Sequence, residues 1–144
     1  MKRLRIIYGA GCWFFGILSG IGHTVFELGP KPASIHDLIL AQQQTIISMP
    51  GTETSVYRLT LGVSLIMGLM LLGYGVTHFA ILLSTPKQNL PSLPIQIINL
   101  IFVIAAFVLT INYLFMVPIV LTGLATLCFA FVLIATLTNT KAHQ

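Results

Sequence analysis

The sequence predicts an all-α protein, a bundle of four transmembrane helices, on the basis of three observations. Of the 144 residues, 56% are hydrophobic and only 7% are charged, whereas about 25% of the residues of an ordinary soluble domain are charged. The apolar residues form long runs separated by short segments rich in proline and glycine. A chain this short also keeps roughly a third of its surface exposed when it folds. Because too few polar residues are available to cover that surface, we expect lipid to cover it.

The first two runs each have the length that a spanning helix needs, about 20 apolar residues. The first, residues 6–28, ends at a Gly-Pro-Lys-Pro segment, since proline lacks the amide donor that a continuing helix requires. The second, residues 56–83, follows Thr54 and Ser55, either of which can cap it, and ends before Pro86.

Between these runs, residues 34–48 predict a short amphipathic helix. Ile35, Leu38 and Ile39 fall at helical spacing, and Asp37 follows Ser34 by three residues, an arrangement similar to a capping box. We expect an interfacial helix of about three turns that lies on the membrane surface.

The last apolar stretch, residues 95–137, is about twice as long as a bilayer requires, so it must fold back on itself. We place the third helix at residues 95–117 and the fourth at 118–137, with a tight turn near residues 116–118. Pro118 is then in the first turn of the fourth helix, where its missing donor costs nothing.

The basic residues predict which side of the membrane each end faces. With the N-terminus in the cytoplasm, five of the seven Lys and Arg residues lie on the cytoplasmic side, as the positive-inside rule requires. The five are Lys2, Arg3, Arg5, Lys87 and Lys141. We therefore expect a multi-pass protein of a bacterial inner membrane with both termini in the cytoplasm. The cations do not gather on one face, which excludes a nucleic-acid partner.

Polar residues near one depth of the bundle predict a binding site at the outer face, because polar groups within a membrane are costly unless they have a role. His23 and Glu27 are four residues apart and share a helix face. The further candidates at this depth are Arg58, Asn112, Tyr57 and Tyr113. We expect the amphipathic segment, with His36 and Asp37, to cover this site. The alternative is structural: an ion pair between Glu27 and Arg58, a bond from His23 to a carbonyl, and an aromatic belt.

Other chemistry has weaker signals. His23, Glu27 and His36 could approach a metal ion, but the chain lacks a strong ligand motif, so we predict no metal and name no catalytic residue. The cofactor is unknown. His78 is expected to bond a carbonyl or reach the headgroups; as the alternative, imidazole suits a proton relay.

Small residues recur at four-residue spacing, Gly16 with Gly20 and Ser64 with Gly68. Such pairs allow two helix backbones to approach closely. They predict a tight contact between the first and second helices, or equally a face for a second copy of the chain.

The Gly22-His23 pair, the Gly-Pro-Lys-Pro segment at 29–32 and the sequence Tyr-Arg-Leu-Thr-Leu-Gly-Val-Ser at 57–64 resemble a family of small four-helix bacterial membrane proteins of uncharacterised activity. The chain is also broadly similar to the DoxX-like group. The resemblance covers residues 1–75 and implies the fold and a bacterial inner membrane. Where the family carries a histidine in its second helix, this chain has Leu65 or Ile66.

Three classes of function remain at this point. The one we favour is an accessory or scaffold subunit of a larger membrane assembly. The alternative is an oligomeric binder or transporter of a small molecule, a lipid or a quinone, with the polar site near the outer face. An intramembrane enzyme that uses His23 and Glu27 as acid and base is the least favoured. The expected partners are the lipid bilayer and a larger complex or a second copy.

Overall fold

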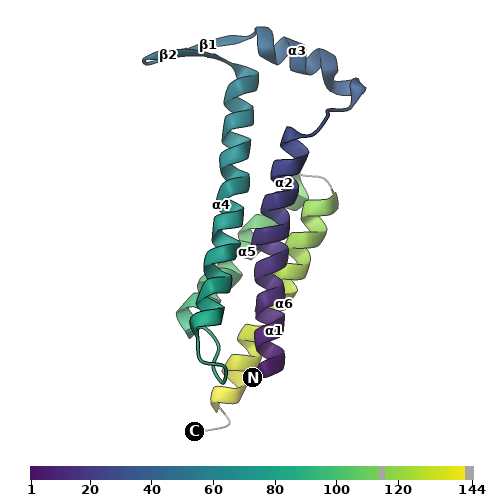
Figure 1. Cartoon of the computed structure of the whole chain (residues 1–144). Helices are drawn as coiled ribbons and strands as arrows, with labels where there is room; N and C mark the ends of the chain where they lie inside the picture. The colour runs from purple at the N-terminus through teal and green to yellow at the C-terminus, as the bar shows by residue number, and fades with distance from the viewer. Residues whose placement is uncertain (114–115, 142–144) are drawn as a thin grey trace.

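The computed structural model describes residues 1–113 and 116–141, with the backbone alone at residue 113 and at residues 139–141. It confirms the all-α bundle, to which one small β-hairpin is added (Figure 1). Four helices are long and apolar enough to cross a membrane: Lys2–Leu28, Val56–Ser84, Leu93–Asn112 and Met116–Thr138. The chain is therefore a multi-pass membrane protein.

The first span is one continuous rod built of three segments. These are α1 (Lys2–Cys12), the π-helical segment η1 (Trp13–Leu18) and α2 (Ser19–Leu28). The hydroxyl of Ser19 donates to the carbonyl of Phe14, five residues earlier, at 2.7 Å. A π-helical turn is rare and is found frequently at functional sites.

The connection after this span differs from the prediction. It contains the short helix η2 (Ala33–Ile35), α3 (His36–Gln44), and the antiparallel strands β1 (Ile46–Met49) and β2 (Thr52–Ser55). The predicted helix over 34–48 is thus right only for its central part. The turn explains the difference, because Gly51 has a φ of 84° after Pro50, a combination that suits a turn between strands.

The predicted helix caps have mixed outcomes. No side chain caps α3, so the cap expected from Ser34 is wrong. In contrast, the Ser55 hydroxyl accepts a hydrogen bond from the Arg58 amide at 3.3 Å and caps α4 (Val56–Ser84), as predicted.

The predicted turn between the third and fourth helices lies too late in the sequence. Helix α5 spans Leu93–Tyr113 and α6 spans Met116–Lys141, so Met116 and Val117 belong to the last helix. Pro118 is nevertheless in the first turn of α6, as expected. A proline is tolerated throughout that turn, and it does not fix how many residues precede it.

Glycines bring the first span and α4 together, while α6 lies on the other side of that span and α5 packs on α6. A Cβ atom added to Gly75 would lie 2.7 Å from the Cα of Gly16, and one added to Gly20 would lie 2.6 Å from the amide nitrogen of Leu72. Gly68 faces Gly20 and Thr24. The predicted contact between the first two spans is confirmed, and it uses these glycine faces within one chain.

One end of the bundle, here called the base, contains the start of α1, the end of α4 and the start of α5; α3 and the hairpin lie at the opposite, hairpin end (Figure 1). The fully buried side chains of the core include Tyr8, Cys12, Val103 and Phe129. Tyr8 and Phe129 meet edge to face, with ring centroids 5.3 Å apart. The base is accordingly the densely packed part of the molecule.

Candidate functional site

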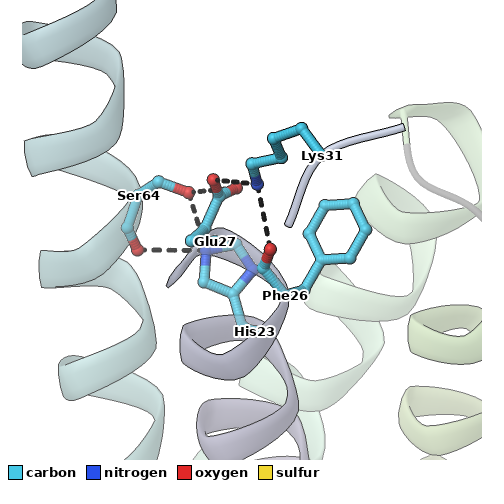
Figure 2. A network of polar contacts seen from close by, with 5 residues as sticks. All are labelled: His23, Phe26, Glu27, Lys31 and Ser64. Carbon is cyan, nitrogen blue, oxygen red and sulfur yellow. Dashed lines mark hydrogen bonds and ion pairs between the residues drawn. The ribbon is translucent and has the colours of Figure 1, made fainter. Parts of the chain in front are cut away.

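Towards the hairpin end, α2 and α4 are joined by a polar chain of four side chains (Figure 2). The Nε2 atom of His23 is 3.0 Å from the Ser64 carbonyl oxygen and 2.8 Å from the Ser64 hydroxyl. That hydroxyl donates to one carboxylate oxygen of Glu27 at 2.9 Å, and the other carboxylate oxygen is 3.1 Å from the Lys31 ammonium. We call these residues, His23, Glu27, Lys31 and Ser64, the polar chain.

Lys31 closes this chain at the end of α2. Its ammonium also donates to the carbonyl of Phe26 at 2.9 Å and lies 4.6 Å from the centroid of the Phe26 ring. A cation near the last carbonyls of a helix is favoured by the helix dipole. Lys31 therefore holds the Glu27 carboxylate and the Phe26 backbone in one arrangement.

Lys31 takes the place that the sequence interpretation gave to Arg58. Arg58 is exposed, and the cation that pairs with Glu27 is Lys31. Lys31 lies just beyond the end of α2, where the chain leaves the helix and its ammonium reaches back to the Glu27 carboxylate, whereas Arg58 lies in the first turn of another helix. The ion pair between Glu27 and Arg58 is therefore wrong, but the bond from His23 to a backbone carbonyl, which the structural alternative also expected, is confirmed at the Ser64 carbonyl.

The structure does not bring the remaining candidates into the polar chain. Asn112 is exposed, and its amide donates to the carbonyl of Val108 in its own helix at 2.7 Å. His36 and Asp37 are exposed on α3. The side chain of Tyr113 lies outside the described residues. Similar depth in the bundle was the reason for grouping these residues, and depth does not decide which way a side chain points around its helix.

Next to the polar chain lies a cavity of about 390 Å³, which we call the main cavity. Its walls come from η1 and α2, from α4, from α5 and from the start of α6, so all four spans contribute. Most of its lining side chains are apolar, among them Phe15, Leu18, Phe26, Met67 and Leu109. The polar ones are Ser19, His23, Thr110 and Thr122.

A smaller cavity of about 170 Å³ lies beside α3 and is lined by Glu27, Lys31, Tyr57 and Gln42 among others. Phe26 lines both cavities. Tyr57 is half-buried here, so of the predicted site residues His23, Glu27 and Tyr57 come close to the cavities. Phe26, whose ring lies 4.6 Å from the Lys31 ammonium, is therefore common to both cavities.

A second group of polar residues lies at the base, where sequence reasoning named His78 but none of the residues of this group. The amide of Asn99 donates to the Tyr8 hydroxyl and its oxygen accepts from the Tyr74 hydroxyl, each at 2.5 Å. Gln96 is also buried and accepts from Thr136 at 3.1 Å. A signal for this group was present in the sequence, because Gln96 and Asn99 are amides near the start of a long apolar run. In the structure, Asn99 is fully buried.

His78 belongs to this base region and not to the polar chain. Its ring centroid is 4.2 Å from that of Tyr74. Its Nδ1 atom is buried and has no hydrogen-bond partner in the part of the chain that the structure describes. Of the two expectations for His78, a bond to a carbonyl is not made by Nδ1 within the described residues, and contact with the headgroups stays a prediction.

The arrangement places a mostly apolar cavity beside a chain of polar side chains. Within residues 1–113 and 116–141, no three His, Cys, Asp or Glu side chains form a group suited to a metal ion. Comparison with protein-family models, with curated proteins and with solved structures finds no match to this chain. The resemblance to small four-helix bacterial proteins and to the DoxX-like group therefore stays an expectation, and the site has to be interpreted from its own geometry.

Proposed function

We propose that this protein binds an amphiphilic molecule of the lipid or quinone class within the membrane. The main cavity receives the apolar body of this ligand, and the polar chain receives its head. The single observation that carries the proposal is the main cavity itself, about 390 Å³ of mostly apolar space bounded by all four spans. Binding sites for small molecules commonly have volumes of about 300–1,000 Å³ and mostly apolar walls.

The position of the polar chain supports an amphiphile over a plain hydrocarbon. His23 belongs to both the chain and the cavity wall. The charged members, Glu27 and Lys31, lie at the end of α2, next to the smaller cavity under α3. A ligand that lies along the bundle would place its apolar part among Leu18, Met67 and Leu109 and its head beside His23.

The π-helical segment supports the same function. Phe15 and Leu18 belong to η1 and line the cavity, and Ser19 directly follows it. A π-helical turn changes the direction of the side chains around it and is frequent at functional sites. In this chain it occurs where the first span passes the cavity.

The membrane and the orientation are part of the proposal. With both termini in the cytoplasm of a bacterium, the polar chain is near the outer face of the inner membrane. The excess of Lys and Arg at the base supports this orientation, with Lys2, Arg3, Arg5 and Lys87 at that end of the spans.

The accessory-subunit function stays a prediction, but one of its supports has changed. Glycine faces were expected to receive either the second helix or a partner, and Gly16, Gly20 and Gly68 are covered within the chain. The main cavity favours the function of binding a small molecule. This proposal does not depend on the oligomeric state.

The proposal is tested with Gly22→Leu. Gly22 lines the main cavity, and a Cβ atom added there would meet no atom within 4 Å, so a leucine side chain can enter the cavity without disturbing the backbone. The matched control is Gly73→Leu, since Gly73 is equally open but does not line the cavity.

Each form is purified from its native membrane in mild detergent, and the bound small molecules are identified by native mass spectrometry and extraction. We expect the wild type and Gly73→Leu to carry the same amphiphile and Gly22→Leu to lose at least about nine-tenths of it, since overfilled sites exclude their ligand. Equal occupancy of all three proteins would show that the main cavity is not the binding site.

A further inference from the structure

The hydroxyl groups that line the main cavity have no hydrogen-bond donor left for a ligand. Ser19 donates to a carbonyl five residues earlier at 2.7 Å, and Thr122 donates to one four residues earlier at 2.7 Å. The hydroxyls of Thr110 and Thr122 are 3.0 Å apart and either can donate to the other, while the carbonyl three residues earlier is 2.8 Å from the Thr110 hydroxyl, so both protons have acceptors within the protein. Each hydroxyl has a single proton, so these three side chains keep only acceptor positions.

The remaining polar side chain, His23, has its proton fixed by the polar chain. The Ser64 carbonyl near Nε2 can only accept, and the Ser64 hydroxyl gives its proton to Glu27. Nε2 must therefore be the protonated nitrogen. The Glu27 carboxylate has Lys31 as its counter-ion at 3.1 Å, so the polar chain is charge-balanced when the imidazole carries a single proton. In the neutral ring, Nδ1 then has a free lone pair.

This lone pair belongs to the edge of the ring that faces away from α4. The Cδ2 atom of His23 is 3.2 Å from the position that a Cβ atom on Gly68 would take. Its Nε2 atom contacts Ser64 (Figure 2), and Gly68 and Ser64 both belong to α4. Nδ1 lies across the ring from Cδ2. No hydrogen bond joins Nδ1 to any residue that the structure describes. His23 is also one of the residues that line the main cavity.

We propose that the ligand is a long-chain molecule whose head donates a hydrogen bond, in the chemical class of alcohols and hydroquinols, and that Nδ1 of His23 accepts this bond. The inference rests on the proposed function and adds the chemistry of the head. A hydroxyl matches a cavity whose side chains offer acceptors. A head that has only acceptors, such as a ketone, an ester or an oxidised quinone, cannot donate a hydrogen bond to these lone pairs and is repelled by them.

The test uses three probes with the same chain of fourteen carbons: 1-tetradecanol, its methyl ether and 2-tetradecanone. Each is titrated into the purified wild-type protein in one detergent, and native mass spectrometry gives the bound fraction at each mole fraction of probe in the micelle. We expect the alcohol to bind roughly fivefold more tightly than the ether and the ketone, the effect of about one hydrogen bond. Equal binding of the three, or preference for the ketone, overturns the inference. This comparison needs no variant.

Two variants assign the selectivity to His23. His23→Phe keeps a ring of similar shape and removes Nδ1, so the ratio of alcohol to ether binding should fall to about one while the affinity for the ether stays within about twofold. His36→Phe is the matched control, because it makes the same change at a histidine that is exposed and lines neither cavity, so the selectivity should stay as in the wild type. Selectivity that survives in His23→Phe would show that another group accepts the bond.

The two proposals fail in different ways. If all three probes bind the wild type equally and are excluded by Gly22→Leu, the cavity is a binding site and the inference about its head chemistry is wrong. If none of the probes binds at any mole fraction, or if Gly22→Leu binds them as the wild type does, the proposed function fails with it.

Discussion

The Asn99 amide at the base and the His23 ring towards the hairpin end use their polar groups in opposite ways. At the base, both polar groups of the Asn99 amide are bonded, one to Tyr8 and one to Tyr74, and the space around them is filled. Towards the hairpin end, His23 uses one ring nitrogen for Ser64 and leaves the other at the wall of the main cavity. A fully satisfied network rigidifies a fold, whereas a partly satisfied one beside a cavity is available to a ligand.

Charged residues show the same division. Arg5 at the base donates to four carbonyls where α4 ends, those of Leu82, Thr85, Pro86 and Asn89, at 2.6–3.1 Å. Glu27 and Lys31 instead border the smaller cavity. The base therefore holds the helices together, and the hairpin end has room between them. Substitutions at the base should change stability without changing selectivity for a ligand.

The largest effect is expected where the first span and α4 touch, between the two regions. Gly16→Leu would drive a side chain into the backbone of Gly75, so we expect a loss of about 3 kcal/mol in the free energy of unfolding. The measurement is thermal unfolding in detergent followed by circular dichroism. Gly62→Leu is the control, since a Cβ atom there would meet nothing within 4 Å. Equal melting temperatures for the two variants would contradict the close backbone contact.

A smaller loss is expected from Arg5→Ala, which leaves the carbonyls at the end of α4 without their charged donor. We expect about 2 kcal/mol, because hydrogen bonds from a charged group are stronger than neutral ones. Limited proteolysis should also become faster in the connection at residues 85–92. Arg3→Ala, at an exposed position two residues away, is the matched control. If both variants behave alike, the role of Arg5 is limited to its charge.

The smallest of the three effects compares two asparagines of one helix, α5. Asn99→Leu leaves two tyrosine hydroxyls without their amide partner, and we expect a loss of about 1.5 kcal/mol. Asn112→Leu is the control, since Asn112 is exposed and bonds only its own helix. Neither variant should change the selectivity between the alcohol and its ether. A larger loss for Asn112→Leu would show that the hairpin end depends on its polar groups for stability as well.

The sequence predicted the helices better than the contacts between their side chains. Pro30 and Pro86 mark the ends of two spans, and the glycines at 16, 20 and 68 predicted the contact between them. The hairpin at 46–55 was missed because Ile46 and Ile47, which begin it, also fit the helical spacing of the apolar residues before them. Of the site, His23 and Glu27 were identified, but Ser64 was assigned to packing and Lys31 to topology, although both belong to the polar chain.

What the sequence determined by itself is the number of spans, because apolar length and the missing donor of proline act locally along the chain. Only the tertiary structure decided which polar residues meet. Successive residues of a helix point about 100° apart, so residues at one depth, such as His23 and Asn112, can face entirely different neighbours. The main cavity was decided in the same way, since its walls come from all four spans and its volume depends on how closely their backbones approach.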